Sequence, residues 1–148
     1  MTKWWFIGAA ALLAVLLIVS IALALLSEET EFAPGTPEAA VQNLLRAAEN
    51  DDIETAYGML SEDLRGKCKL KDFGDGGYRR WDDRNIRATL RDTKLIDDIT
   101  FVNVQITEFH SSGPFDSGES SFNRRFALQQ EGGEWKFTDY PWPYDYCK

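Results

Sequence analysis

The residues able to act as a general acid or base are few, and their surroundings are typical of turns. The chain has one histidine, His110, which precedes Ser111, Ser112 and Gly113, so we expect it in an exposed turn. The aspartates that occur in adjacent pairs stand where helix caps and turns are expected, and we expect them to be solvated: Asp51, Asp52, Asp82, Asp83, Asp97 and Asp98. Acid–base catalysis needs such groups held beside a substrate proton. We therefore expect no catalytic set.

The basic residues are concentrated in one stretch. Residues 65–94 hold ten of the sixteen lysines and arginines, with only five acidic residues among them. Two interpretations stay open: a solvated loop whose charges pair locally, and a docking face for an acidic protein patch or lipid phosphates. Arginine and aromatic residues are enriched at interfaces, so the docking candidates here are Arg79, Arg80, Trp81 and Arg84.

The aromatic C-terminal tail also allows two interpretations. Trp142 and Tyr144 each stand beside a proline, and their rings could stack on a partner or pack over the domain's own sheet. The chain as a whole has a formal net charge of −8, which repels polyphosphate backbones. We therefore expect a protein partner and no nucleic acid.

The N-terminal segment predicts a membrane anchor. Residues 4–26 carry no charge, and 23 residues in a helix rise roughly 34 Å against a hydrocarbon core of about 30 Å. Lys3 before the segment and three glutamates after it predict an N-terminus inside the cell and a C-terminal domain outside. Trp4 and Trp5 would then lie at the membrane interface. The alternative is a signal peptide cleaved near Ala24.

Cysteine content excludes a metal scaffold and suggests a disulfide. Two cysteines and one histidine cannot provide the spacing of a zinc site, so we expect no metal and no cofactor. In an exported chain the even pair favours a bridge between Cys68 and Cys147. Such a bridge closes a loop of roughly 80 residues, worth about 4 kcal/mol in the chain-entropy model. The alternative is two separate buried thiols.

The helices and strands that would position these residues come after a short acidic linker at residues 27–35. Thr36 as a cap, Pro37 and apolar spacing predict a helix over residues 37–49. A second helix is predicted from a cap at Asp51, with Tyr57 on its apolar stripe as core or pocket wall rather than as an acid. The stripe consists of Ile53, Ala56, Tyr57, Leu60 and Leu64.

Downstream, alternating apolar residues predict antiparallel strands. Val102, Val104 and Ile106 alternate with polar residues, and further strands are expected over residues 122–130 and 134–139, joined by a glycine turn at 131–133. Residues 65–94 are expected to form a loop, with a short helix near 79–87 and a strand over 88–95. Helices followed by such a sheet indicate an α+β fold.

Two motifs resemble the nuclear-transport-factor-2-like superfamily. Residues 36–61 are similar to its opening pair of helices, with Pro37, Val41 and Leu44 in the first and the Ala56-to-Leu60 spacing in the second. The run Gly-Glu-Trp-Lys-Phe at 133–137 is similar to its last strand. The resemblance covers residues 36–140 and implies a cone of helices on a curved antiparallel sheet with a pocket between them. The basic insert and the aromatic tail depart from the pattern.

Relatives in that superfamily imply two kinds of function. Several bacterial members stand on one N-terminal membrane helix within secretion or transport machinery, whereas enzymatic members are isomerases or dehydratases that use pocket Asp, His or Tyr. Pairing of two copies is common among such domains, so a homodimer stays open.

Taken together, these features predict an α+β chain with a transmembrane helix (1–26), a linker (27–35) and a cone-like domain (36–148). We expect a single-pass, exported, non-catalytic binding domain that contacts membrane lipid through its helix and serves as an accessory or assembly subunit of a membrane or envelope complex. The alternatives are a pocket enzyme of the isomerase or dehydratase type and a secreted small-ligand binder.

Overall fold

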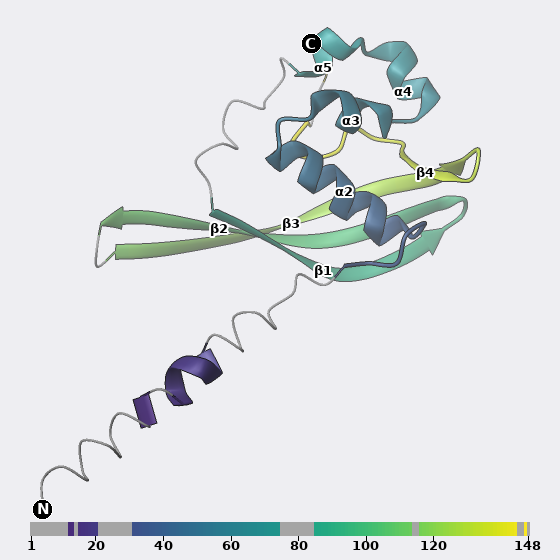
Figure 1. Cartoon of the computed structure of the whole chain (residues 1–148). Helices are drawn as coiled ribbons and strands as arrows, with labels where there is room; N and C mark the ends of the chain where they lie inside the picture. The colour runs from purple at the N-terminus through teal and green to yellow at the C-terminus, as the bar shows by residue number, and fades with distance from the viewer. Residues whose placement is uncertain are drawn as a thin grey trace, which may run out of the picture. The chain divides into compact units, whose positions relative to one another are not determined.

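In the computed structural model, the described residues are 12–13, 15–20, 31–74, 85–113, 116–144 and 147. The chain divides into two compact units, Met1–Glu31 and Phe32–Lys148. The described residues of the second unit contain four helices, α2 (Pro37–Glu49), α3 (Ile53–Gly58), α4 (Glu62–Lys67) and α5 (Leu70–Gly74). Its four strands are β1 (Asn85–Ile96), β2 (Ile99–Gly113), β3 (Asp116–Glu131) and β4 (Glu134–Phe137). They form one antiparallel sheet in the order β1-β2-β3-β4 (Figure 1).

The expectation of a membrane-spanning helix is wrong. Among the described residues, no helix is both long and apolar enough to cross a membrane. The fold prediction that began with such a helix, the single-pass location and the inside–outside orientation all fall with it. The structure instead consists of small helices and a four-stranded antiparallel sheet. Trp4 and Trp5, expected at the membrane interface, lie outside the described residues.

Helix α2 has the bounds that the sequence predicted. Thr36 caps it by accepting a hydrogen bond from the Ala39 amide at 3.2 Å, and Pro37 occupies the first turn, where its missing N–H costs nothing. Val41 and Leu44 are buried on the same side, at 2% and 0% exposure. This face packs against β2 and β4.

The second predicted helix is instead two helices, and its cap lies one residue later. Asp52, not Asp51, caps α3, accepting from the Thr55 amide at 3.0 Å. The Thr55 hydroxyl also donates to Asp52, and these two hydrogen bonds hold the Asp52 pKa below its usual value. Asp51 adopts a left-handed φ of 58°. The helix stops at Gly58, and Ser61 caps the separate helix α4.

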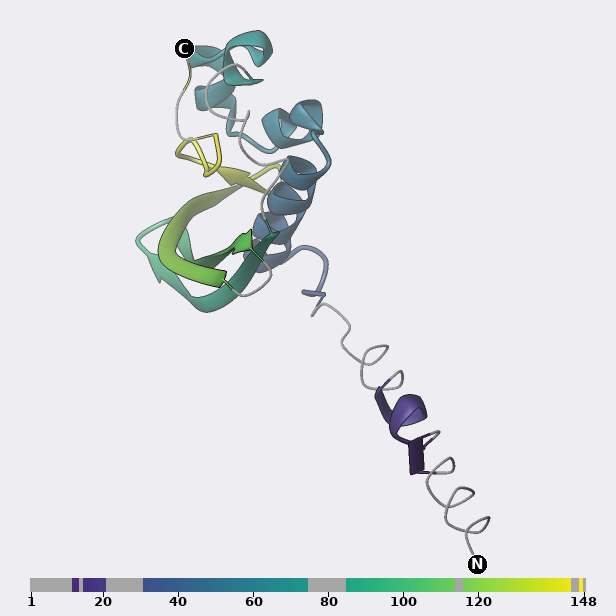
Figure 2. The same ribbon diagram turned by 90° about the vertical axis from the view of Figure 1, so that its left-hand side faces the viewer.

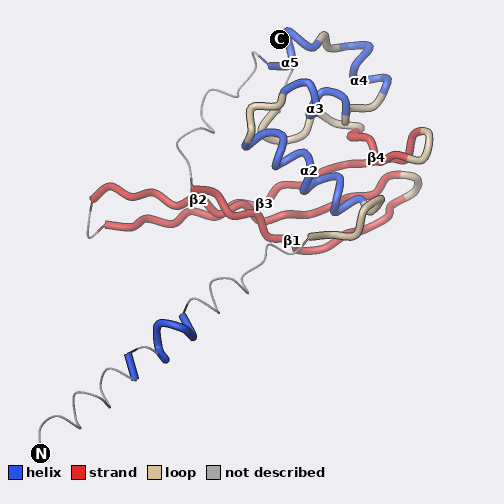
Figure 3. Tube along the Cα trace, viewed as in Figure 1, coloured by secondary structure: helices blue, strands red, loops and turns tan. Residues whose placement is uncertain are grey.

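The strands follow the predicted alternation but extend further. In β2, Val102, Val104 and Ile106 are almost fully buried, and β2 pairs with β3 from Thr100↔Leu128 outwards. The predicted glycine turn is confirmed, because Gly132 and Gly133 have φ of 60° and 87°. The long β1–β3 strands are continuous, whereas loops separate the short helices (Figure 3).

The expected helix near residues 79–87 is wrong where it can be compared. Residues 85–87 belong to β1, which pairs with β2 from Asn85↔Phe109 onwards. Residues 79–84 lie outside the described residues. Pairing with β2 gives the backbone N–H and C=O groups of alternate β1 residues their hydrogen-bond partners. That ladder decides the conformation here over local sequence preference.

Phe137 joins the helical half to the sheet. Its amide donates to the Met59 carbonyl and its carbonyl accepts from the Ser61 amide, both at 2.9 Å. Its ring is fully buried and lies edge-on to Phe126 at 6.1 Å. Figure 2 shows the sheet bending along β3, with α2 on the open side of the bend. Phe137 of β4 therefore holds the helices and the sheet together in two ways, through its backbone hydrogen bonds and through its buried ring.

Truncation of Phe137 should destabilise the domain strongly. We expect Phe137→Ala to lower the free energy of unfolding by about 3–5 kcal/mol, because the ring is fully buried and its loss leaves a cavity. Urea denaturation followed by circular dichroism measures the change. Phe109→Ala is the control, since Phe109 is 38% exposed, and it should cost clearly less. Equal costs for the two variants would contradict this account of the core.

Candidate functional site

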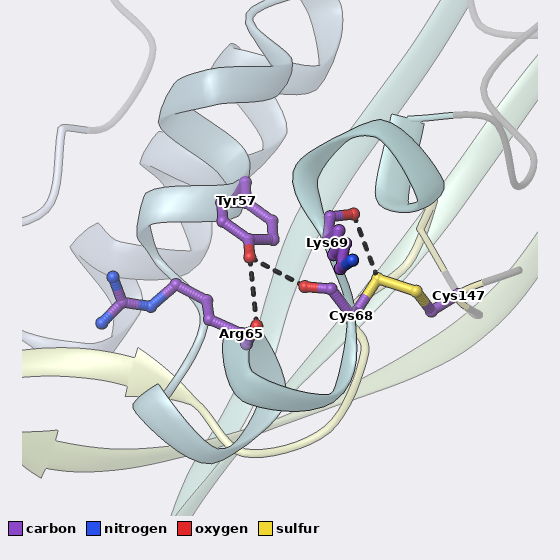
Figure 4. The surroundings of a disulfide bond; sticks show 5 residues. All are labelled: Tyr57, Arg65, Cys68, Lys69 and Cys147. Carbon is purple, nitrogen blue, oxygen red and sulfur yellow. Dashed lines mark hydrogen bonds between the residues drawn. A yellow bond between two sulfur atoms is a disulfide. The ribbon is translucent and has the colours of Figure 1, made fainter.

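Tyr57 and His110, which were considered for catalysis, occupy well-defined places in the fold. The half-buried Tyr57 donates its phenolic hydroxyl to the Cys68 carbonyl at 2.7 Å, and the Arg65 carbonyl lies 3.2 Å away (Figure 4). This phenol therefore fastens α3 to the end of α4. His110 lies within β2 opposite Gly118, so the expectation of a turn is wrong, because pairing with β3 continues past it.

Exposed aspartates occupy caps and turns, as expected. Asp51, Asp52, Asp97 and Asp98 are exposed, whereas Asp82 and Asp83 lie outside the described residues. The described parts of the chain contain no group of three or more His, Cys, Asp or Glu residues arranged to hold a metal ion.

The cysteines that the sequence analysis paired are joined in the structure. Cys68 and Cys147 form a disulfide with 5.8 Å between their Cα atoms and 79 residues of sequence separation. Cys68 is 1% exposed and belongs to the core, and Cys147 packs against it (Figure 4). The bridge therefore fixes the end of the chain to the C-cap of α4.

The aromatic tail packs on its own domain. Tyr144 is 1% exposed and stacks on the buried Phe73 of α5, with 4.5 Å between ring centroids. Trp142 is half-buried and meets Phe122 edge-on at 5.7 Å, with Arg124 5.9 Å from its ring. Of the two interpretations of the tail, the structure favours packing over docking, because Tyr144 offers almost no surface to a partner.

The other docking candidates cannot be placed, because Arg79, Arg80, Trp81 and Arg84 lie outside the described residues. Two parts of the basic stretch are placed: residues 65–74 contain the end of α4 and all of α5, and residues 85–94 lie in strand β1. There Arg87, Arg91 and Lys94 are all exposed. Strand β3 adds Arg125, which the sequence analysis did not associate with them.

We call the group Arg87, Arg91, Lys94, Arg125, Phe101 and Phe109 the basic face. The register places Phe101 and Phe109 on the side of β2 opposite Val102 and Val104, which point toward α2. Figure 1 shows helices α3 to α5 on the α2 side of the sheet. Among the described residues of the second unit, the basic face is thus the side that no helix covers.

Arginine–aromatic contacts organise the basic face. The Arg87 guanidinium lies 5.4 Å from the Phe109 ring centroid, and the Arg125 guanidinium lies 5.5 Å from that of Phe101. Arg91 donates to the Gln105 side chain. These contacts hold charged side chains over the sheet in defined positions.

A carboxylate sits among these cations. Asp92 lies 2.5 Å from the Lys94 ammonium, and this hydrogen bond, with a second from Asn103, holds the pKa of Asp92 below its usual value. Asp92 is therefore charged at neutral pH and offsets part of the positive potential. A β-bulge between Leu90 and Asp92 sets the position of this residue, and the period-two pattern of the sequence does not reveal such a shift.

Comparisons with known proteins give a likeness of fold. No protein-family model matches the chain, and no curated protein sequence matches it. The structure is similar to the solution structure of a SEC-C motif containing protein from Rhodopseudomonas palustris. The two chains are 14% identical, with a TM-score of 0.53 over 73% of this chain and 79% of the other. At this identity the likeness concerns the fold alone.

Removal of the disulfide should loosen the tail. We expect Cys147→Ser to lower the free energy of unfolding by up to about 4 kcal/mol, since the bridge constrains a long loop of the unfolded chain. Hydrogen exchange should rise in residues 138–144 and change little in β2. The control is the parent protein in dithiothreitol, which should reproduce the variant. Unchanged exchange in the tail would contradict this role for the bridge.

Proposed function

We propose that this domain is a non-catalytic protein-binding module, an accessory or assembly subunit of a larger protein complex, and that its basic face binds an acidic surface of a partner. The observation that carries the proposal is the clustering of four exposed cations around two aromatic rings on the uncovered side of the sheet. The partner's chemistry follows from the sign of this charge.

Charge distribution makes the basic face distinctive. The chain has 24 acidic and 16 basic residues, yet three basic residues of β1 and one of β3 meet on one side of the sheet. In a chain of net charge −8, such a face attracts an acidic partner while the rest of the surface repels it. Arginine with aromatic rings is also the composition enriched at the centre of protein interfaces.

Preorganisation supports the same proposal. A flexible arginine loses side-chain entropy when a partner fixes it, and this loss weakens binding. Here the Arg125 guanidinium already contacts the Phe101 ring and lies 3.4 Å from the Asn103 side-chain oxygen. Part of the entropy cost of fixing the Arg125 side chain is therefore met before a partner binds.

The binding function stands ahead of the isomerase or dehydratase alternative. That chemistry requires an acid or base presented to a substrate, and the phenol of Tyr57 is engaged with backbone carbonyls. We further propose that the domain belongs to the nuclear-transport-factor-2-like superfamily. The support is the opening helix α2 with its Thr36 cap, followed by α3 and the antiparallel sheet.

An acidic peptide tests the proposed function directly. A fluorescently labelled glutamate-rich peptide should bind the domain, and fluorescence anisotropy measures its affinity. We expect Arg87→Gln with Arg125→Gln to weaken binding by about tenfold or more, because two charge-assisted contacts are lost. Raising the salt concentration should weaken binding of the parent protein too.

The matched control removes two positive charges elsewhere. Arg65→Gln with Lys71→Gln alters exposed residues of α4 and α5 and should change the affinity little. The same affinity loss in both double variants would mean that only net charge matters and would contradict a specific site. Sedimentation of each protein shows whether two copies associate.

Neutralising Asp92 should strengthen the same interaction. Asp92→Asn removes the carboxylate that offsets Lys94, so we expect the acidic peptide to bind a few-fold more tightly at neutral pH. The comparison variant is Asp63→Asn, which removes a carboxylate paired with Lys67 on α4. A rise for Asp92→Asn that Asp63→Asn does not share places the peptide on the basic face.

A further inference from the structure

A depression of mixed polar and apolar lining at one end of the sheet is separate from the basic face. It lies beside the β1–β2 turn and the end of β3, and its lining residues are Leu95, Asp97, Asp98, Thr100, Gln129, Gln130 and Trp135. We call the hollow lined by these residues the end depression. Leu95 is 70% exposed, although a side chain of this size gains free energy by leaving water. The residue is thus placed to pack against something further.

The aromatic wall of the end depression is fixed in place. The indole N–H of Trp135 donates to the Gly35 carbonyl at 2.9 Å, and the ring is half-buried against the core. On the other strand pair, the Ile96↔Ile99 register leaves Asp97 and Asp98 as a two-residue turn, with Asp97 at a φ of 52°. Both the apolar and the acidic walls are therefore built by hairpin geometry.

The charge around the end depression is negative. Asp97 and Asp98 are exposed and line it. The neighbouring β3–β4 turn carries Glu131, which accepts from the Glu62 amide at 3.2 Å, and Glu134, which pairs with Lys136 at 2.8 Å. The two aspartates thus line the depression together with Leu95 and Trp135, and their charge can attract a cation from a partner.

We infer that the end depression binds a lysine or arginine side chain from a basic, apolar segment of another protein. The aliphatic stem of such a side chain packs on Leu95 and the Trp135 ring, while its charged end reaches Asp97 and Asp98. Complementarity of charge selects this occupant over an acidic segment, for which the aspartates are repulsive. A second copy of this chain, with net charge −8, fits the acidic rim less well.

Peptide binding to the whole chain tests this inference. The probe is a labelled peptide that alternates lysine and leucine, with a glutamate–leucine peptide of the same length for comparison. We expect the glutamate peptide to bind the basic face, as proposed above, and the lysine peptide to bind the end depression. Leu95→Ser should weaken its binding about tenfold, and Asp97→Asn with Asp98→Asn should do the same. Asparagine keeps the left-handed turn, so the second variant retains the fold.

Two matched controls make the result specific. Ile96→Ser changes the adjacent residue, which is 54% exposed but does not line the end depression. Asp51→Asn removes an exposed aspartate with a φ of 58° in the α2–α3 turn. Both should leave the affinity nearly unchanged. Thermal unfolding of every variant shows whether the fold is retained.

Several outcomes would overturn the inference. Equal weakening by Leu95→Ser and Ile96→Ser would show that any exposed apolar residue near this turn contributes. Equal weakening by the Asp97/Asp98 and Asp51 variants would show general attraction to an acidic chain. Absence of lysine-peptide binding by the parent protein would refute the charge argument. An equal loss of glutamate-peptide binding in Leu95→Ser would also refute it, because that peptide is expected on the basic face. Self-association that Leu95→Ser abolishes would make a second copy the occupant. Binding to the basic face is measured with the acidic peptide, so the two proposals fail separately.

Discussion

The backbone of Phe137 is the constraint on which the rest of the domain depends. Its two hydrogen bonds to Met59 and Ser61 tie the break between α3 and α4 to the last strand of the sheet. The ring below fills the space between sheet and helices next to Phe126. Because these contacts cover one side of the sheet, the other side is left to carry polar and charged groups. The basic face is thus a consequence of how the core is closed.

Much of the second unit could be predicted from the sequence, because strong local signals agree with the packing. The cap at Thr36, the apolar spacing of α2 and the two glycines of the β3–β4 turn each specify one conformation. The break after Gly58 could not be predicted, because Leu60 and Leu64 continue the helical stripe. Pairing of Leu60 with Phe137, 77 positions along the chain, decides against a continuous helix.

The candidate site was predictable only in part, since charge composition locates a basic stretch but not its geometry. The sequence analysis assigned docking to Arg79, Arg80, Trp81 and Arg84, whereas the cations of that stretch that the structure places on the sheet are those of β1. Arg125 joins them through strand register, which a single sequence does not reveal across two strands. The membrane prediction was wrong because uncharged length was its main basis, and the described residues contain no helix of that length.

The covalent link between Cys68 and Cys147 encloses all four strands within one ring of the chain, because β1 begins at Asn85 and β4 ends at Phe137. A single cut of the backbone anywhere inside that ring leaves both pieces joined through sulfur. The sheet therefore remains one molecule after such a cut, and its strands separate only when a second event opens the bridge. The position of the disulfide, in addition to the packing of the core, thus keeps the strands together after a protease cuts the chain once.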